Sequence, residues 1–184
     1  MTGGPTVGVL LAAGHSHRWG PDNKLLAPWN GQALVVRAGA LLARAPVDLR
    51  AVVLRDKRIA ALLPGLEPLA PDGEDQSASL RAAVAWAEGL GAARLLVLLG
   101  DMPALSDATV AALVKGCTGD RPSAVLHPDG RPGAPACVPA SAFAALSKLR
   151  GDQGAGVLLG DAVTIPAAPA ELVDVDRPQD LSAG

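Results

Sequence analysis

Aromatic side chains are scarce in this chain of 184 residues, which holds one Phe, three Trp and no Tyr. The core must therefore be built mainly of aliphatic side chains, and the chain lacks the aromatic platform on which single-stranded nucleic acid stacks. Acidic and basic residues nearly balance, giving a net charge of −2. This balance excludes a general nucleic-acid binder, so any bound anion must be held by local cations.

The sequence also lacks a long apolar run and a disulfide or metal pattern of cysteines. No apolar run approaches the roughly 18 residues that a membrane span requires, and Met1–Pro5 lacks the basic start of a secretory signal. Cys117 and Cys137 do not have the spacing of a metal site and are expected to be reduced thiols. We therefore expect a cytoplasmic protein that has no membrane contact and folds as a single domain over residues 1–184.

Short apolar runs alternate with amphipathic stretches. The predicted strands are Thr6–Leu11, Leu49–Leu54, Leu66–Ala70, Arg94–Leu99, Ser123–His127 and Ala134–Val138, with short extended pieces at Val163–Ile165 and Leu172–Val175. The predicted helices are Gly31–Ala45, Lys57–Leu63, Ser77–Glu88, the stretch from the N-cap Ser106 to Lys115, Ser141–Leu149, Gly154–Leu159 and a last one beginning at Pro178. This order predicts βαβ units and a mostly parallel sheet between helices. The hairpin-like region Ser123–Val138 makes that sheet mixed, and the very apolar Arg94–Leu99 is expected near its centre.

The segment from Val7 to Lys24 begins as a buried strand and ends as a polar, basic loop. The small residues Ala12–Gly14 let backbone N–H groups approach phosphate oxygens, and Arg18 and Lys24 supply positive charge. Neither a Walker A loop nor a dinucleotide fingerprint is present. The residues alone leave two interpretations open: a phosphate-binding loop at the edge of a parallel sheet, or an ordinary loop with solvated basic side chains.

Three acidic residues follow predicted strands or lie on an extended piece. Asp101 comes directly after the most apolar strand, where ligands bind in open α/β sheets, and a carboxylate there suits Mg²⁺. Alternation puts Asp174 and Asp176 on the same side of their segment, so that one of them is a candidate second metal ligand. The plainer alternatives are a turn-forming role for Asp101 and helix capping by Asp176.

The segment Gln76–Arg81 begins a predicted helix with two serines. Backbone donors and hydroxyls at a helix N-terminus can contact a base, a ribose or an anion. Plain capping of the helix by Ser77 is the alternative.

Together these segments resemble the MobA-like nucleotidyltransferases, most closely the branch of molybdenum cofactor cytidylyltransferases (MocA-like). The resemblance rests on motifs that occur in the family's order and span nearly the whole chain. These motifs are LAAGHSHRWG (Leu11–Gly20), Lys24–Leu26 with Pro28–Trp29, Ser77–Ala82, GDMP (Gly100–Pro103), Gly151–Ala155 and Asp174–Leu181.

The resemblance implies a three-layer α/β/α Rossmann-like nucleotidyltransferase fold with a mostly parallel mixed sheet. It implies an enzyme that binds a nucleoside triphosphate with Mg²⁺ or Mn²⁺ and transfers the nucleoside monophosphate to a phosphorylated acceptor, releasing pyrophosphate. In the most similar branch the acceptor is molybdopterin. Ala13 stands where guanylyl-transferring relatives usually have glycine, which favours CTP as the substrate.

The resemblance also assigns roles to particular residues. Lys24, Arg18 and Asp101 would be catalytic, and Asp101 and Asp176 would hold the metal. The nucleotide would be bound by Leu11, Ala12, Ala13, Gly14, Ser16, Arg18, Lys24, Gln76, Ser77, Ser79, Leu80 and Asp101. As partners it implies the small-molecule substrates, contact with a molybdoenzyme or its chaperone, and a monomer or weak dimer.

Four positions depart from the family pattern: Asp75, Ala134, Gly156 and Arg177. Ala134 and Gly156 lie in segments associated with the acceptor, so the acceptor is less firmly implied than the nucleotide. Two alternatives therefore stay open. One is a GTP- or sugar-phosphate-using enzyme of the same fold, and the other is a non-catalytic nucleotide-binding relative.

Overall fold

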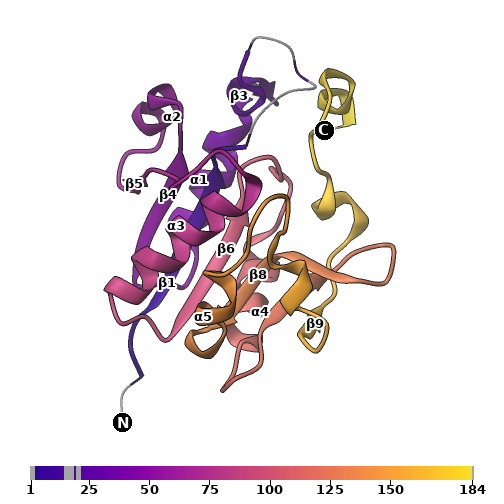
Figure 1. Ribbon diagram of the computed structural model, residues 1–184. Helices are drawn as coiled ribbons and strands as arrows, with labels where there is room; N and C mark the ends of the chain where they lie inside the picture. Colours follow the sequence, from indigo (N-terminus) through magenta and orange to yellow (C-terminus); the bar gives the residue numbers. More distant parts are fainter. Residues whose placement is uncertain (1–2, 15–18, 20–21, 184) are drawn as a thin grey trace.

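The computed structural model describes residues 3–14, 19 and 22–183. Within this part of the chain, a seven-stranded sheet has the order β5-β4-β1-β6-β8-β7-β9 (Figure 1). Its strands are β1 (Thr6–Ala12), β4 (Leu49–Leu54), β5 (Glu67–Leu69), β6 (Arg94–Leu99), β7 (Ser123–Leu126), β8 (Pro132–Pro139) and β9 (Val163–Ile165). Only β8 runs antiparallel to its neighbours among these strands. The predicted mostly parallel mixed sheet is confirmed, with β6 as its middle strand.

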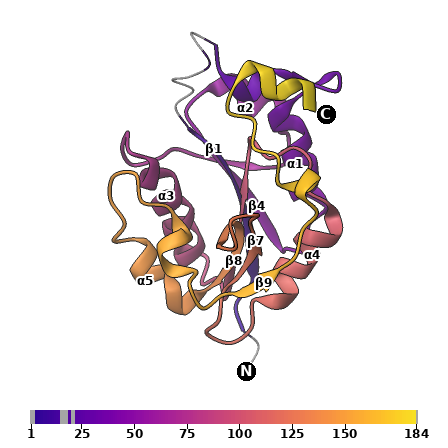
Figure 2. The ribbon, with the colours of Figure 1, turned by 90° about the vertical axis from the view of Figure 1, so that its right-hand side faces the viewer.

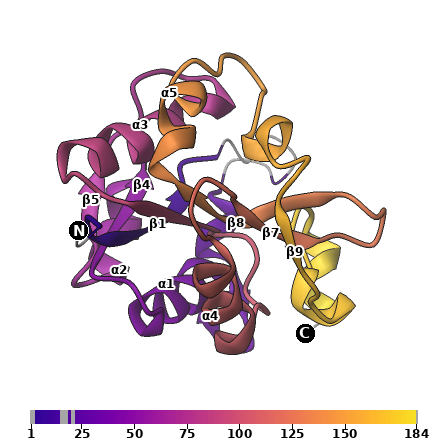
Figure 3. The same cartoon turned by 90° about the horizontal axis from the view of Figure 1, so that it is seen from below.

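Helices cover both faces of this sheet (Figures 2 and 3). The α-helices are α1 (Leu34–Arg44), α2 (Lys57–Leu62), α3 (Gln76–Gly89), α4 (Asp107–Gly116) and α5 (Phe143–Leu146). The 3₁₀-helices are η1 (Lys24–Leu26), η2 (Ala140–Ala142), η3 (Ala155–Leu158), η4 (Pro169–Leu172) and η5 (Pro178–Ala183). None of the helices in the described part of the chain is long and apolar enough to span a membrane.

Two aliphatic cores result from the alternation of side chains along the central strands. Leu10 and Leu98 point to the face that packs against α1, α2 and α4. Val9 and Val97 point to the opposite face, which packs against α3 and α5. Since successive side chains of a strand point to opposite faces, both layers of helices are held by the same strands. The predicted three-layer α/β/α architecture is confirmed.

The register of the parallel strands brings their carboxyl ends to one edge. Leu11 of β1 is paired with Val53 of β4 on one side and with Leu99 of β6 on the other. The residues that follow these strands therefore lie together, which is the usual place for a ligand in an open α/β sheet.

The structure corrects three predicted elements. The helix expected from Gly31 begins at Leu34, because Asn30 and Gly31 have positive φ values of 48° and 82° in the turn between β2 (Pro28–Trp29) and β3 (Gln32–Ala33). The helix expected over residues 141–149 is divided between η2 and the single turn of α5. The extended piece expected at 172–175 starts one residue later, because Leu172 ends η4.

Candidate functional site

A cavity of about 580 Å³ lies at the carboxyl edge of the central strands. Its lining combines segments from both ends of the chain and from α3. The lining residues are Leu11, Ala13, Gly14, Lys24, Leu25, Glu74, Asp75, Gln76, Ser79, Leu99, Asp101, Asp152, Asp174 and Asp176. Six of these side chains are carboxylates, so the cavity suits ligands that carry hydrogen-bond donors or come with cations.

The end of β1 forms one side of this cavity through Leu11, Ala13 and Gly14. The N–H of Gly100 donates to the carbonyl oxygen of Leu11 (N···O 3.0 Å), which holds the ends of β1 and β6 together. A Cβ at Gly100 would lie only 3.2 Å from that oxygen, so glycine permits the close approach. Ala12 does not line the cavity, since its side chain is buried in the core.

Two predicted members of this loop, Ser16 and Arg18, lie outside the described residues. Their predicted contacts with the nucleotide remain predictions.

Lys24 is placed at the cavity by the 3₁₀-helix η1, whose first turn is capped by Asn23. The Asn23 Oδ1 accepts a hydrogen bond from the N–H of Leu25 at 3.0 Å. The Lys24 Nζ lies 2.7 Å from Asp101 Oδ2 and 3.0 Å from Asp176 Oδ1. Burial alone would lower the pKa of Lys24, but the charges and hydrogen bonds of these carboxylates raise the pKa above its usual value. Lys24 is therefore a fixed cation between two acids.

Asp101, Asp174 and Asp176 form a carboxylate cluster, with one oxygen of each lying within 4.8 Å of the others. The chain segment 173–176 is held there because the N–H of Val175 donates to the backbone oxygen of Asp101 (3.1 Å). The side chain of Val175 is fully buried with Trp29. Asp174 and Asp176 flank this valine and both line the cavity, as the predicted alternation requires.

The surroundings of Asp174 change the pKa of its carboxyl group. Burial, followed by the charges of Asp101 and Asp176, raises the pKa of Asp174 to about 6. Three carboxylates at this spacing repel one another and offer only oxygen donors. Such a donor set fits a hard divalent cation such as Mg²⁺ or Mn²⁺.

Helix capping by Asp176 is the plainer alternative to metal binding, but at the start of η5 the carboxylate that accepts backbone N–H groups is that of Asp180. Its carboxylate Oδ2 accepts from the N–H groups of Asp176 (3.0 Å) and Arg177 (2.7 Å). The side chain of Asp176 faces Lys24.

The N-terminus of α3 provides Gln76 and Ser79 to the cavity. The other two predicted nucleotide-binding residues of this helix do not line it. Ser77 is buried and its hydroxyl donates to Asp75 Oδ2 (2.7 Å), whereas Leu80 packs in the core. The structure thus brings together half of the predicted helix residues as cavity-lining side chains.

Sequence reasoning missed Arg55 and the acidic residues Glu74, Asp75 and Asp152. The Nε of Arg55 donates to the carbonyl oxygen of Ala13 (3.2 Å), and its guanidinium also donates to the Gly73 carbonyl and pairs with Glu74 at 3.2 Å. Arg55 directly follows β4, a position at the same edge as Ala13, and this placement is the signal that could have identified it. Asp152, which comes to the cavity through a turn, lies in the motif Gly151–Ala155, and this motif is the signal that could have identified it.

Comparisons with known proteins agree with a nucleotide-binding protein of this fold. A model of the family described as "MobA-like NTP transferase domain" matches residues 8–166. A protein of Chloroflexus aggregans, named a probable molybdenum cofactor guanylyltransferase, is 32% identical over 126 residues, which make up 66% of this chain. The aligned part spans only 59% of that relative's length.

Solved structures share the fold over nearly the whole chain. The homologue of Mycobacterium tuberculosis Rv0371c from Mycobacterium sp. strain JC1 is 29% identical, with a TM-score of 0.81, and the match covers 96% of this chain and 93% of that one. Rv0371c of M. tuberculosis H37Rv in complex with manganese is 24% identical, with a TM-score of 0.78, and the match covers 98% and 97% of the two chains.

Proposed function

Because the chain belongs to the MobA-like NTP transferase family, we propose that it is a divalent-metal-dependent nucleotidyltransferase. Its reaction is the transfer of CMP from CTP to the molybdenum cofactor, or to a similar phosphorylated acceptor, with release of pyrophosphate. One observation carries the proposal. The carboxylate cluster of Asp101, Asp174 and Asp176 meets Lys24 in the cavity next to the small-residue end of β1.

The residues suit phosphoryl chemistry that needs no general base. The acceptor phosphate has a second pKa of about 6 and is largely ionised at neutral pH. One of its oxygens forms a bond to the α-phosphorus of CTP, while the bond from that phosphorus to the bridging oxygen breaks and pyrophosphate leaves. The protein then has to position the two anions and neutralise their charge. Among the described residues that line the cavity, Lys24 provides the positive charge for this task through its fixed ammonium group.

Asp101, Asp174 and Asp176 would hold a Mg²⁺ or Mn²⁺ ion. Bound there, the metal supplies Lewis-acid stabilisation of the charge on the phosphate oxygens. Asp101 is central to this arrangement, because its carboxylate also contacts Lys24 and its backbone oxygen holds the segment that carries the other two acids. The manganese complex of the mycobacterial structure supports a divalent ion in such a protein.

The opposing chemistry of the lining suggests how the nucleotide lies. Phosphates are repelled by carboxylates and favour Lys24, the metal and the backbone N–H groups of the loop after β1. Ribose hydroxyls and a base amino group are donors, which favour the acceptors Gln76, Ser79 and Asp152. We therefore place the nucleoside at the N-terminus of α3 and the triphosphate at β1.

The choice of CTP rests on Ala13, which lines the cavity where a glycine would leave more room. A second candidate is GMP transfer from GTP, which the name of the C. aggregans relative favours. Both reactions use the same metal and acceptor chemistry, so they differ only in the contacts made with the base.

Thermal stabilisation of the protein tests the choice of nucleotide. Since a ligand that binds only the folded state raises the melting temperature, CTP with Mg²⁺ should raise it more than GTP or ATP with Mg²⁺. A larger shift with GTP would favour the second candidate. Equal shifts, or no shift, with all three nucleotides would refute the CTP assignment. Radiolabelled nucleotide transfer to candidate acceptors then separates molybdopterin from a sugar phosphate.

Absence of turnover would point to a non-catalytic relative. Such a protein would bind a nucleoside triphosphate but release no pyrophosphate in the presence of the acceptor.

A further inference from the structure

Two segments far apart in the sequence build the side of the cavity that contains the N-terminus of α3. We call this side the α3 wall and define it by Glu74, Asp75, Gln76, Ser79 and Asp152. The first four residues precede or begin α3, whereas Asp152 lies in the turn 149–152 that follows α5. Something must hold this turn against the helix, since the wall exists only while the two segments stay together.

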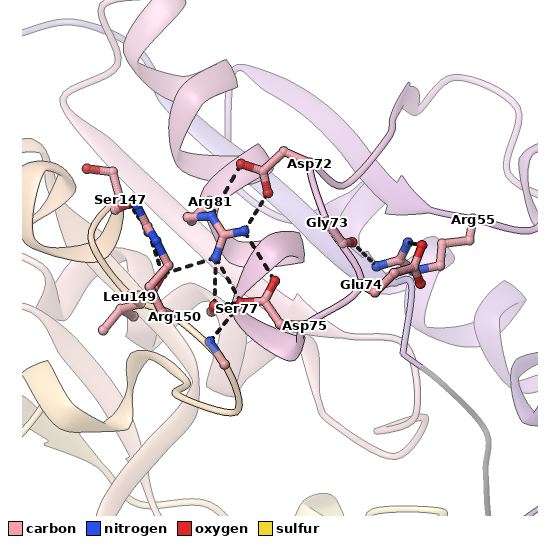
Figure 4. Close-up of polar contacts among 11 residues, drawn as sticks. Arg55, Asp72, Gly73, Glu74, Asp75, Ser77, Arg81, Ser147, Leu149 and Arg150 are labelled. Atoms are coloured by element: carbon pink, nitrogen blue, oxygen red, sulfur yellow. Dashed lines mark hydrogen bonds and ion pairs between the residues drawn. The ribbon is translucent and has the colours of Figure 1, made fainter.

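Arg81 is not among the residues that line the cavity. Figure 4 shows its guanidinium between Asp72, Asp75 and Ser77. Its guanidinium reaches Asp72 with two bonds, Nη2···Oδ1 at 2.8 Å and Nε···Oδ2 at 3.2 Å. It reaches Asp75 with two more, Nη1···Oδ2 at 3.1 Å and Nη2···Oδ1 at 3.2 Å. Only 13% of the side chain is exposed. The planar fork of arginine therefore fixes the loop before α3 through two carboxylates at once.

The same guanidinium holds the turn 149–152. The Nη1 of Arg81 donates to the carbonyl oxygen of Leu149 (3.0 Å), and the N–H of Gly151 donates to Asp75 Oδ2 (2.7 Å). The N–H of Ser77 also donates to the carbonyl oxygen of Gly151 (3.0 Å). Two of these three bonds depend on the Arg81–Asp75 pair, so this pair joins the turn to the helix.

We infer that Arg81 is a positioning residue for nucleotide binding, which locks the turn 149–152 onto the N-terminus of α3 and so keeps Gln76, Ser79 and Asp152 in one wall. The inference rests on the proposed function, because it assumes that the nucleoside lies against this wall. Asp75 is its essential partner. Asp75 is one of the four positions that depart from the family pattern, and its carboxylate bridges Arg81 and Gly151.

Substitutions of Arg81 should affect nucleotide binding at the α3 wall but not metal binding at the carboxylate cluster. Arg81→Ala removes the bond to Leu149 and the ion pair that orients Asp75, and so loosens the turn. A misplacement of about 1 Å can lower a reaction rate about a hundredfold. By the same reasoning we expect the affinity for CTP or GTP with Mg²⁺ to fall about tenfold or more. The affinity for Mn²⁺ alone should not change, because the carboxylate cluster is held by Val175 and not by Arg81. Both affinities are measurable by titration calorimetry of the full chain.

Three further variants make the test sharper. Arg81→Lys keeps the charge but cannot make two paired contacts, so it should lose nucleotide affinity as Arg81→Ala does. Asp75→Asn keeps the shape of the side chain and should also weaken nucleotide binding. It therefore serves as the test if Arg81→Ala fails to fold. Arg44→Ala is the matched control, since Arg44 forms an exposed ion pair with Asp107 away from the cavity lining and should leave both affinities unchanged.

The outcomes distinguish the inference from the proposed function. Unaltered nucleotide affinity in Arg81→Ala or Asp75→Asn overturns the inference alone. A parallel loss of nucleotide and Mn²⁺ affinity also overturns it, because Arg81 would then merely stabilise the fold. If the unsubstituted protein binds neither CTP nor GTP, the proposed function fails and the inference fails with it.

Discussion

Asp101 connects the separate parts of the carboxylate cluster. Its side chain contacts Lys24 at 2.7 Å, and its backbone oxygen accepts from Val175, which lies between the other two acids. The carboxylate is partly exposed, with 24% of the side chain accessible, so it can reach a ligand. A change of this one side chain should therefore affect the chemistry and leave the backbone contact intact.

Asp101→Asn should abolish nucleotidyl transfer while leaving the fold unchanged. Asparagine keeps the shape but lacks the negative charge that a divalent cation requires. Pyrophosphate release measures activity, and circular dichroism with a melting curve measures the fold. Asp107→Asn, which changes an exposed acid of α4, serves as the control. Normal turnover in Asp101→Asn would contradict the assigned metal site.

Asp174→Asn should raise the stability of the metal-free protein at neutral pH. The unfolded chain releases this proton near pH 3.8 and the folded protein at about 6, so the stability of the folded protein falls as pH rises between these values. Because the carboxylate is only partly shielded from solvent, screening limits the gain at neutral pH to about 1 kcal/mol. Urea unfolding in EDTA at several pH values measures it. A gain that persists unchanged below pH 3.8 would contradict the explanation that burial and neighbouring charges disfavour the ionised carboxylate.

At the scale of elements, the strand ends were more predictable than the C-terminal segment. The boundaries of Leu49–Leu54 and Arg94–Leu99 agree with the sequence, because continuous apolar runs bounded by polar residues mark buried strands. The capping role of Ser106 was also visible in the sequence, and its hydroxyl accepts from the N–H of Thr109 at 3.2 Å. The site residues at strand ends, Asp101 and Ala13, came from the same local signal.

The α3 wall, in contrast, depends on tertiary contacts that no local pattern records. Asp152 joins the cavity because Arg81, Asp75 and the N–H of Ser77 bond to its turn. Ser77 looked like a ligand-binding hydroxyl, but it is buried and bonded to Asp75. A serine at a helix start does not reveal by itself which way its hydroxyl will point.

The 3₁₀-helix η4 is tied to α4 through Glu171. The carboxylate Oε2 accepts from the N–H of Ser106 (2.9 Å) and from the hydroxyl of Thr109 (2.7 Å). Although burial opposes its charge, these hydrogen bonds lower the pKa of Glu171 below its usual value. Glu171 thereby helps to fix the chain just before Asp174.

Glu171→Gln should loosen this connection. Losing a carboxylate at a helix N-terminus costs about 1 kcal/mol of stability, which urea unfolding at neutral pH would detect. Since the native pKa is lowered, the difference from the unsubstituted protein should shrink as the pH falls below about 4.5. We also expect weaker Mn²⁺ binding, because segment 173–176 follows η4. Glu88→Gln, an exposed change near the end of α3, should alter neither quantity. Equal effects of the two substitutions would contradict this role.

At the scale of the whole molecule, the cavity draws on nearly the full length of the fold. The end of β1, the 3₁₀-helix η1, the start of α3, Leu99 and Asp101 at the end of β6, and the C-terminal segment all contribute to one lining. The register of the central sheet brings the ends of β1 and β6 together. The buried side chain of Val175 holds the C-terminal segment next to them. The proposed reaction therefore depends on the assembled fold, and no single segment could carry it out alone.

Pyrophosphate release in the presence of molybdenum cofactor tests that claim most directly. The assay compares CTP, GTP and ATP, each with Mg²⁺ and each again with EDTA. The account predicts release that requires the acceptor, is fastest with CTP and stops when EDTA removes the metal. Release from none of the three nucleotides, although the protein binds them, would contradict it.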